Sequence, residues 1–165
     1  MVAARQHCTA RAVDDRHLRA GAGPLSASTE RIEILESADR EALALLVVAA
    51  GAASDKLAER SVAIDLAELL SVVDVFLITS GRNARQVATI VEEIEAQVKA
   101  ALGRSPIRIE GQSEASWVLM DYGDVVIHVF DPETREYYDL EHLWSGAPRI
   151  EIDPAGPQAL AAAEG

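Results

Sequence analysis

This chain of 165 residues has a single cysteine, no long apolar run and far fewer cations than anions. One thiol, Cys8, excludes an internal disulfide and a cysteine-rich metal site. The longest apolar run, residues 42–53, falls short of the ~20 residues that a membrane-spanning helix needs. No basic segment followed by an apolar one opens the chain, so the sequence predicts a cytoplasmic protein without a membrane partner.

The shortage of cations limits the choice of partners. The chain has 15 Lys and Arg against 27 Asp and Glu, a net charge of −12, and residues 1–40 hold six of each sign. The whole excess therefore lies in residues 41–165. Because few cations are available to displace phosphate counterions, direct or sequence-specific nucleic-acid binding is not expected. A basic protein partner fits this charge, although the charge could also serve solubility alone.

Composition along the chain predicts one folded domain between two tails. Residues 1–36 mix Arg, Asp, Ala, Gly, Pro and Ser without periodicity, which predicts a disordered extension. Residues 37–148 carry regular apolar patterns and form the predicted domain. Residues 149–165 are rich in Pro, Gly and Ala, which predicts a flexible tail.

Within residues 37–148 the periodicity predicts an α/β fold, with a mixed β-sheet of about five strands and helices packed on it. The helix at 84–102 has the clearest apolar face and stops at Gly103, and the strand at 72–79 is apolar enough to be central. A turn is expected at 131–134. The other predicted elements are a helix from about 39 to 60, strands at 61–66, 107–110, 117–121 and 125–130, and a short helix at 140–143 that Asp139 caps.

Residues 117–144 hold six of the seven aromatic side chains. The segment begins as a β-hairpin, since Trp117, Leu119 and Asp121 alternate with apolar residues and Gly123 suits the turn. A concentration of aromatic rings is typical either of a dense core or of a contact surface. The pattern alone leaves both interpretations open for Trp117 and Tyr122.

Three groups of residues could carry chemistry, and each has a structural interpretation beside the functional one. Ser80 and Gly81 could present backbone N–H groups to a phosphate, but they lack the glycine spacing of a nucleotide loop and fit a simple chain reversal. Asp121 and Asp124 could bind a divalent metal, but they flank a turn, where aspartate is common. His128 could act as a general base, but a lone strand histidine is more often a packing residue.

Several segments resemble the ribosomal silencing factor family, the Iojap-like proteins. They are, in order, DVFLITSG at 74–81, RQV at 85–87, IEG at 109–111 and WVLMDYGDVVIHVFDPETREYYDLEHLW at 117–144. The resemblance runs from about residue 40 to 148 and keeps the order of the family's motifs. It implies an α/β fold with nucleotidyltransferase-like topology. The Gly-Ser opening and Asp-x-Asp pair of such enzymes are missing, so no catalytic, metal or cofactor site is implied.

The resemblance also implies a function and a set of contacts. It implies binding to the large ribosomal subunit through its fourteenth protein, a block to small-subunit joining, and lower translation when nutrients are short. A homodimer away from the ribosome is a further implication. The alternatives are a metal-dependent nucleotidyltransferase-like enzyme that uses Ser80, Asp121 and Asp124, or an adaptor for another basic partner. The implied partner-binding residues are Trp117, Leu119, Asp121, Tyr122, Asp124, His128, Arg135, Tyr138 and Asp139.

Overall fold

The computed structural model describes residues 40–152, and its first described element is a helix at residues 40–55. The chain divides into two units, and the elements below belong to the second, Glu41–Gly165. They are β1 (Glu59–Asp65), β2 (Val75–Ser80), α3 (Ala84–Leu102), β3 (Arg108–Glu110), β4 (Trp117–Asp121), β5 (Val125–Phe130), α4 (Pro132–Tyr138), α5 (Leu140–Leu143) and β6 (Arg149–Ile150). The predicted extension at 1–36, and residues 153–165 of the predicted tail, lie outside the described residues.

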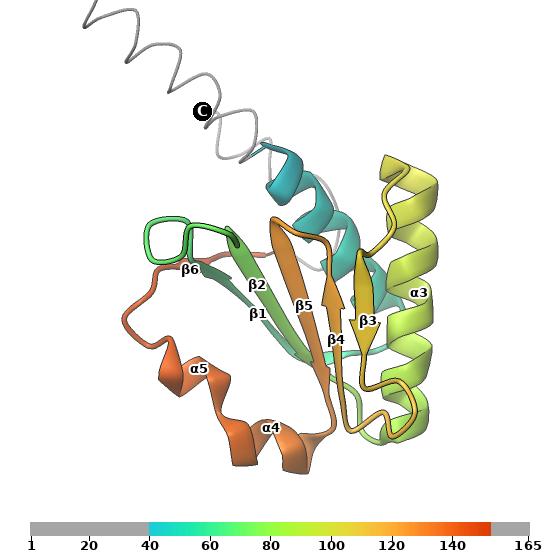
Figure 1. Ribbon diagram of the computed structural model, residues 1–165. Coiled ribbons are helices and arrows are strands. Elements are labelled where there is room, and N and C mark those ends of the chain that lie inside the picture. Colours follow the sequence, from blue (N-terminus) through green and yellow to red (C-terminus); the bar gives the residue numbers. More distant parts are fainter. Residues whose placement is uncertain (1–39, 153–165) are drawn as a thin grey trace, which may run out of the picture. The chain divides into compact units, whose positions relative to one another are not determined.

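The strands form one mixed sheet in the order β3-β4-β5-β2-β1-β6 (Figure 1). Among the described strands, β2 and β5 are the one pair in parallel, and the remaining neighbours are antiparallel. This confirms the predicted mixed α/β fold and the central place of β2, which is buried along nearly its whole length. The sequence pattern did not predict β6, a strand of two residues that pairs with β1.

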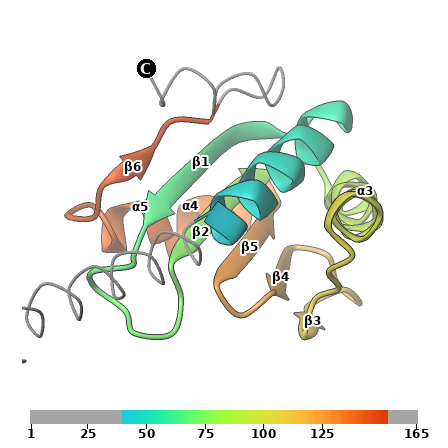
Figure 2. The ribbon, with the colours of Figure 1, turned by 90° about the horizontal axis from the view of Figure 1, so that it is seen from above.

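Residues 40–55 and α3 cover one face of the sheet, and α4 and α5 lie on the other (Figures 1 and 2). The sequence explains α3, because its branched apolar residues recur at helical spacing and are buried in the core, namely Val87, Ile90, Val91, Ile94 and Val98. Asn83 caps its first turn by accepting a hydrogen bond from the Gln86 N–H, and Gly103 ends it in the left-handed region. Both helix ends were expected from the sequence and are confirmed.

The first helix ends earlier than its pattern predicts. The sequence suggests a helix to about residue 60, whereas the helix stops at residue 55. Leu57 and Arg60 have φ angles of 58° and 53°, and such left-handed residues cannot continue a right-handed helix. Leu57 turns the chain toward β1, and Arg60 lies within β1.

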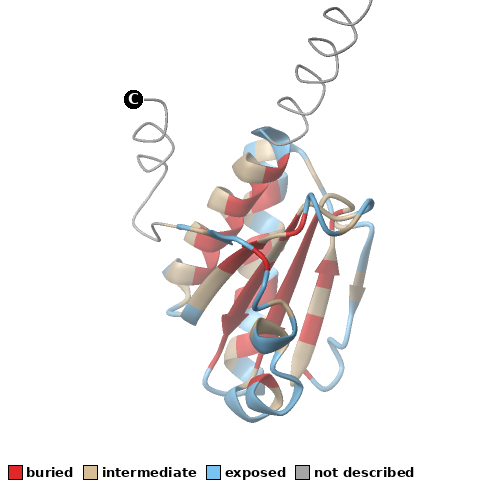
Figure 3. Cartoon of the chain, turned by 90° about the vertical axis from the view of Figure 1, so that its left-hand side faces the viewer, coloured by how far each residue is buried: buried red, intermediate tan, exposed pale blue. Residues whose placement is uncertain are grey.

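The segment after β5 is a helix, so the predicted turn at residues 131–134 is wrong. Asp131 caps α4 through a 2.7 Å hydrogen bond that its carboxylate accepts from the Thr134 N–H, and Pro132 occupies the first turn. Asp followed by Pro marks helix starts as well as turns, which is why the pattern misled. Figure 3 shows that α4 and α5 are largely exposed, in contrast to the buried central strands.

Candidate partner-binding surface

The sheet face that carries α4 and α5 is built from rows of side chains that run across the strands. Residues paired in register on adjacent strands point to the same side and contact one another. Read inward from the β3 edge, the rows are Arg108–Asp121–Val126–Phe76–Ile64, Glu110–Leu119–His128–Ile78–Val62 and Trp117–Phe130–Ser80.

Part of this face stays open to solvent at the β3–β4 edge. We call it the open strip, and define it as Trp117, Leu119 and Asp121 of β4 with Arg108 and Glu110 of β3. The three β4 residues are half-buried, in alternation with the fully buried Val118 and Met120. The side chains of Arg108 and Glu110 are 61% and 57% exposed. The alternation read from the sequence therefore does place Trp117, Leu119 and Asp121 on one face.

Trp117 is the centre of an aromatic cluster at one end of the open strip. Its ring stacks on Phe130 with 5.0 Å between centroids and packs against Tyr138 of α4 at 4.7 Å. Tyr138 is itself 51% exposed, and its neighbour Tyr137 is 81% exposed. The cluster therefore continues the apolar surface from the strand onto the outer side of α4. Leu143 of α5, 68% exposed, adds to the apolar surface of the same pair of helices.

His128 lies beneath this cluster and is 4% exposed. Its Nδ1 accepts a 3.2 Å hydrogen bond from the Trp117 indole N–H, whereas Nε2 is buried without a partner in the described residues. Burial lowers the pKa of His128 to about 4, so the ring is neutral near pH 7. A buried, neutral ring that orients an indole supports the packing interpretation over that of a general base.

Tyr122 and Asp124 lie away from the open strip. Tyr122 is 3% exposed and belongs to the core on the opposite face, where burial raises its pKa to about 12. Asp124 forms a bidentate pair with Arg104, at 2.6 and 3.0 Å, and Arg104 also donates to the Tyr122 carbonyl. These contacts fix the β4–β5 turn, and they leave Tyr122 without a surface from which to touch a partner.

Arg135 is also buried, at 3% exposure, although its neighbours on α4 are exposed. Its guanidinium bonds inward to Glu141, Ser80 and two carbonyls of β1. Asp139 stands exposed between α4 and α5 with a φ of 43°, and its side chain makes no capping bond. Of the nine residues that sequence reasoning selected, Trp117, Leu119, Asp121 and Tyr138 thus share one accessible surface, with His128 directly beneath it.

The Ser80-Gly81 turn has a structural explanation. The Gly81 N–H donates to the Phe130 carbonyl at 3.0 Å, and Ser80 Oγ accepts from Arg135. A Cβ at Gly81 would lie 2.8 Å from the Val87 backbone nitrogen, closer than real Cβ atoms approach. Glycine therefore lets the first turn of α3 approach β2, and its N–H is already engaged.

The residues proposed for metal-dependent chemistry do not converge. Asp121 and Ser80 lie in different rows, about 13 Å apart along the strand direction at 3.3 Å per residue, and on strands that β5 separates. Asp121 accepts from the Gly123 N–H at 2.8 Å, and Asp124 is paired with Arg104. Across residues 40–152 no three His, Cys, Asp or Glu side chains are grouped so that they could hold a metal ion.

Sequence reasoning missed four residues of this surface. Arg108 and Glu110 complete the open strip, and Tyr137 and Leu143 extend the exposed apolar area of α4 and α5. Alternation along residues 107–110 could have placed the first two on one face. Tyr137 followed a segment predicted as a turn, so no helical face was drawn for it. Leu143 lay in the short helix predicted at 140–143, whose exposed face was not assigned from the sequence. In the described part of the chain, none of the helices is apolar and long enough to span a membrane.

The fold defines a class of small α/β proteins with a mixed sheet, and two solved structures of that class are similar to this chain. A crystal structure from Bacillus halodurans matches 67% of this chain and 99% of its own length, with a TM-score of 0.59 and 40% sequence identity. An X-ray structure of a Chromobacterium violaceum protein matches 71% and 98%, with a TM-score of 0.61 and 31% identity.

Sequence relatives then narrow the class to one family. Proteins named ribosomal silencing factor, from Bacillus subtilis and Halalkalibacterium halodurans, are 44% and 42% identical over 109 residues, which is 66% of this chain and 92% of each relative. A mouse protein named Mitochondrial assembly of ribosomal large subunit protein 1 is 39% identical over 74 residues, 44% of this chain and 32% of its own length. The family model "Ribosomal silencing factor during starvation" matches residues 39–164. The chain belongs to the ribosomal silencing factor family, which confirms the resemblance seen in its motifs.

Proposed function

We propose that this protein binds the large ribosomal subunit through its fourteenth ribosomal protein and sterically blocks the joining of the small subunit. Translation would then fall when nutrients are limiting. Family membership and the names of the relatives support a ribosomal partner. The observation that carries the proposal is the open strip with Tyr138 beside it, an indole, a leucine and a phenol next to carboxylates on a part of the sheet that the described helices leave uncovered.

The chemistry of this surface suits a cationic protein. Protein interfaces are enriched in aromatic residues, and carboxylates at their rim pair with Lys or Arg of the partner. Asp121 and Glu110 supply carboxylates within the strip, and the one arginine there, Arg108, is already paired with both. Further carboxylates stand exposed on and beside α4, namely Glu133, Glu136 and Asp139.

The mechanism that we propose needs no catalysis. A domain bound at the face where the small subunit docks would exclude it by its volume alone, so the protein would act in the cytoplasm as a regulator and not as an enzyme. Rings that are already packed lose little conformational freedom on binding. Trp117 is held by Phe130, His128 and Tyr138, which supports its use as a preformed anchor.

The test is to place a cation in the middle of the open strip. Leu119→Arg adds charge and bulk at a half-buried position, and we expect it to weaken binding to purified large subunits by about 2 kcal/mol, roughly 30-fold. Co-sedimentation with large subunits measures binding, and sucrose gradients of mixed subunits measure the block to joining. The variant should lose both activities together.

The matched control is Val72→Arg. Val72 is an exposed apolar residue, at 79%, in the loop between β1 and β2 and outside the strip, so the variant adds the same charge elsewhere on the surface. It should bind and block as the parent does. Circular dichroism and cooperative urea unfolding verify that both variants are folded. Equal binding by the Leu119 variant and the parent would remove the open strip as the contact surface.

We also infer that the protein forms a homodimer when it is not on the ribosome, as the family resemblance implies. An exposed sheet edge supports this, since within residues 40–152 β3 is an edge strand that pairs only with β4. If two copies paired antiparallel about Ile109, Arg108 of one copy would lie opposite Glu110 of the other, an attractive arrangement. Sedimentation equilibrium of the free protein decides the matter, and a monomer at every concentration would contradict it.

A further inference from the structure

The pair of helices α4 and α5 is attached to the sheet through a charged side chain. Surface helices normally bury an apolar stripe. In α4 the buried residue is Arg135, and α5 has no buried residue. Leu140 and Trp144 add only partly buried contacts to the small apolar cluster on this face. The position of these helices therefore depends strongly on the polar contacts of one guanidinium.

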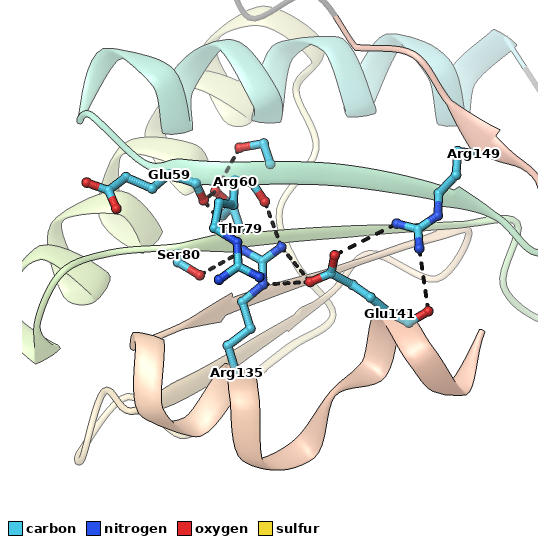
Figure 4. Close-up of polar contacts among 8 residues, drawn as sticks. Glu59, Arg60, Thr79, Ser80, Arg135, Glu141 and Arg149 are labelled. Carbon is cyan, nitrogen blue, oxygen red and sulfur yellow. Dashed lines mark hydrogen bonds and ion pairs between the residues drawn. The ribbon is translucent and has the colours of Figure 1, made fainter. Parts of the chain in front are cut away.

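Those contacts join four elements (Figure 4). Arg135 Nε donates to Glu141 of α5 at 2.8 Å, and Nη2 lies 2.7 Å from the same carboxylate oxygen. Nη1 donates to Ser80 Oγ, at the end of β2, at 2.8 Å. Nη2 donates to the Arg60 carbonyl of β1 at 2.7 Å, and Nη1 lies 3.5 Å from the Glu59 carbonyl.

The backbone of β1 explains why an arginine is needed there. The pairing of β1 with β2 is irregular between Glu59 and Val62, and Arg60 has a φ of 53°, as in a β-bulge. A bulge leaves carbonyls without a ladder partner, and buried unpaired carbonyls are costly. The planar guanidinium offers five donors in a fixed fork, which lets it reach both carbonyls, the hydroxyl and the carboxylate at once.

We propose that Arg135 is a positioning residue for the partner-binding surface. It fixes α4 on the bulge of β1 and the end of β2, and this holds the ring of Tyr138 on Trp117. Residues three apart on a helix lie close together on its surface, so an anchor at Arg135 constrains Tyr138 directly. At 3% exposure Arg135 touches no partner itself. The identity of the partner rests on the proposed function, whereas the shape of the surface does not.

The test measures the environment of Trp117 and the binding of large subunits separately. In a Trp144→Phe parent, Trp117 is the only tryptophan, and acrylamide quenching of its fluorescence reports how well Tyr138 covers it. Arg135→Met keeps an unbranched side chain but removes every donor. We expect the quenching constant to rise about twofold and affinity for large subunits to fall about tenfold, since Trp117 loses its packing partner.

Three further variants separate positioning from general loss of stability. Arg149→Met removes an arginine that lies 3.9 Å from the same Glu141 but is 44% exposed, and it should leave quenching and binding unchanged. Ile94→Val destabilises the core on the opposite face and should not alter the quenching of Trp117. Ser80→Ala removes one acceptor of Arg135, and it should give the same two effects as Arg135→Met at smaller size.

Each outcome supports or overturns the positioning role. A folded Arg135→Met protein with parent-like quenching overturns the proposal, and so does an Ile94→Val protein whose quenching rises equally. If Arg135→Met does not fold, Ser80→Ala decides the question through the same quenching measurement. If quenching rises as expected but the parent does not bind large subunits, the positioning role stands and the proposed function falls.

Discussion

At the scale of single residues, the orientation of the Trp117 indole depends on the neutral state of the His128 imidazole. An indole at a half-open edge needs a hydrogen-bond acceptor to keep one orientation, and the buried imidazole supplies it at 3.2 Å. The imidazole is a good acceptor only while it is neutral. Its surroundings, with rings of Phe76, Trp117 and Phe130 within 6.2 Å, keep it neutral by excluding water.

This arrangement predicts a pH dependence of stability. Burial lowers the pKa of His128 to about 4, below its ordinary value of 6.5, so the unfolded chain binds the proton more readily between these values. Stability that is complete above pH 6.5 should therefore be lost as the pH falls toward 4, by about 1–2 kcal/mol at pH 5. Urea unfolding at a series of pH values measures it.

The matched control compares two histidines. His128→Gln, whose amide oxygen can still accept from Trp117, should flatten the pH dependence in this window. His142→Gln changes an exposed histidine on α5, and stability should depend on pH in this variant as it does in the parent. Parallel curves for the parent and both variants would show that His128 is not the titrating group.

At the scale of elements, the connection from β3 to β4 depends on Gly111. Its φ is 85°, and a Cβ added there would collide with the Trp117 carbonyl oxygen. Glycine therefore serves two needs, a left-handed backbone and close passage past β4. This gives a physical reason for the glycine that directly follows Glu110.

We predict that Gly111→Ala lowers the free energy of unfolding by about 2 kcal/mol or more, because strain and collision add. Gly103→Ala is the matched control: it also replaces a left-handed glycine, with φ of 66°, but a Cβ there meets nothing within 4 Å. It should cost only about 1 kcal/mol. Equal losses in urea unfolding would mean that the contact with Trp117 is relieved by movement of the loop.

The bounds of three elements could be predicted from the sequence alone. The helix Ala84–Leu102 and the strands Trp117–Asp121 and Val125–Phe130 were predicted with the bounds that the structure has. Their apolar periods are long and their ends carry a cap or a glycine. The segment after Phe130 was predicted as a turn and not as a helix, because Asp131 and Pro132 suit a turn and a helix start equally. Only the packing of this segment against the sheet, through Arg135, distinguishes a helix from a turn there.

At the scale of the whole molecule, the charge excess in residues 41–165 should govern the rate of association with a basic partner. Long-range attraction speeds encounter and is screened by salt, whereas contacts at a packed interface set dissociation. The excess charge is spread over many residues of the range 41–165, so no single substitution is expected to abolish the effect.

We predict that raising ionic strength from about 50 to about 300 mM slows association with large subunits by about tenfold and changes dissociation far less. Stopped-flow fluorescence of labelled protein measures both rates. A mixed salt and sucrose series separates ionic strength from viscosity. An association rate that does not respond to salt would show that the charge serves solubility alone.

The sequence by itself determined the fold class, the main elements and the alternation that places Trp117, Leu119 and Asp121 on one face, because these depend on periods of two and 3.6 residues within one segment. Only the tertiary structure decided that Tyr122 closes the opposite core and that Arg135 is an internal anchor. The partners of Arg135 in β1 and β2 lie 55 to 76 residues away along the chain. No local pattern records such contacts, since burial of a charge is settled by what the rest of the chain brings to it.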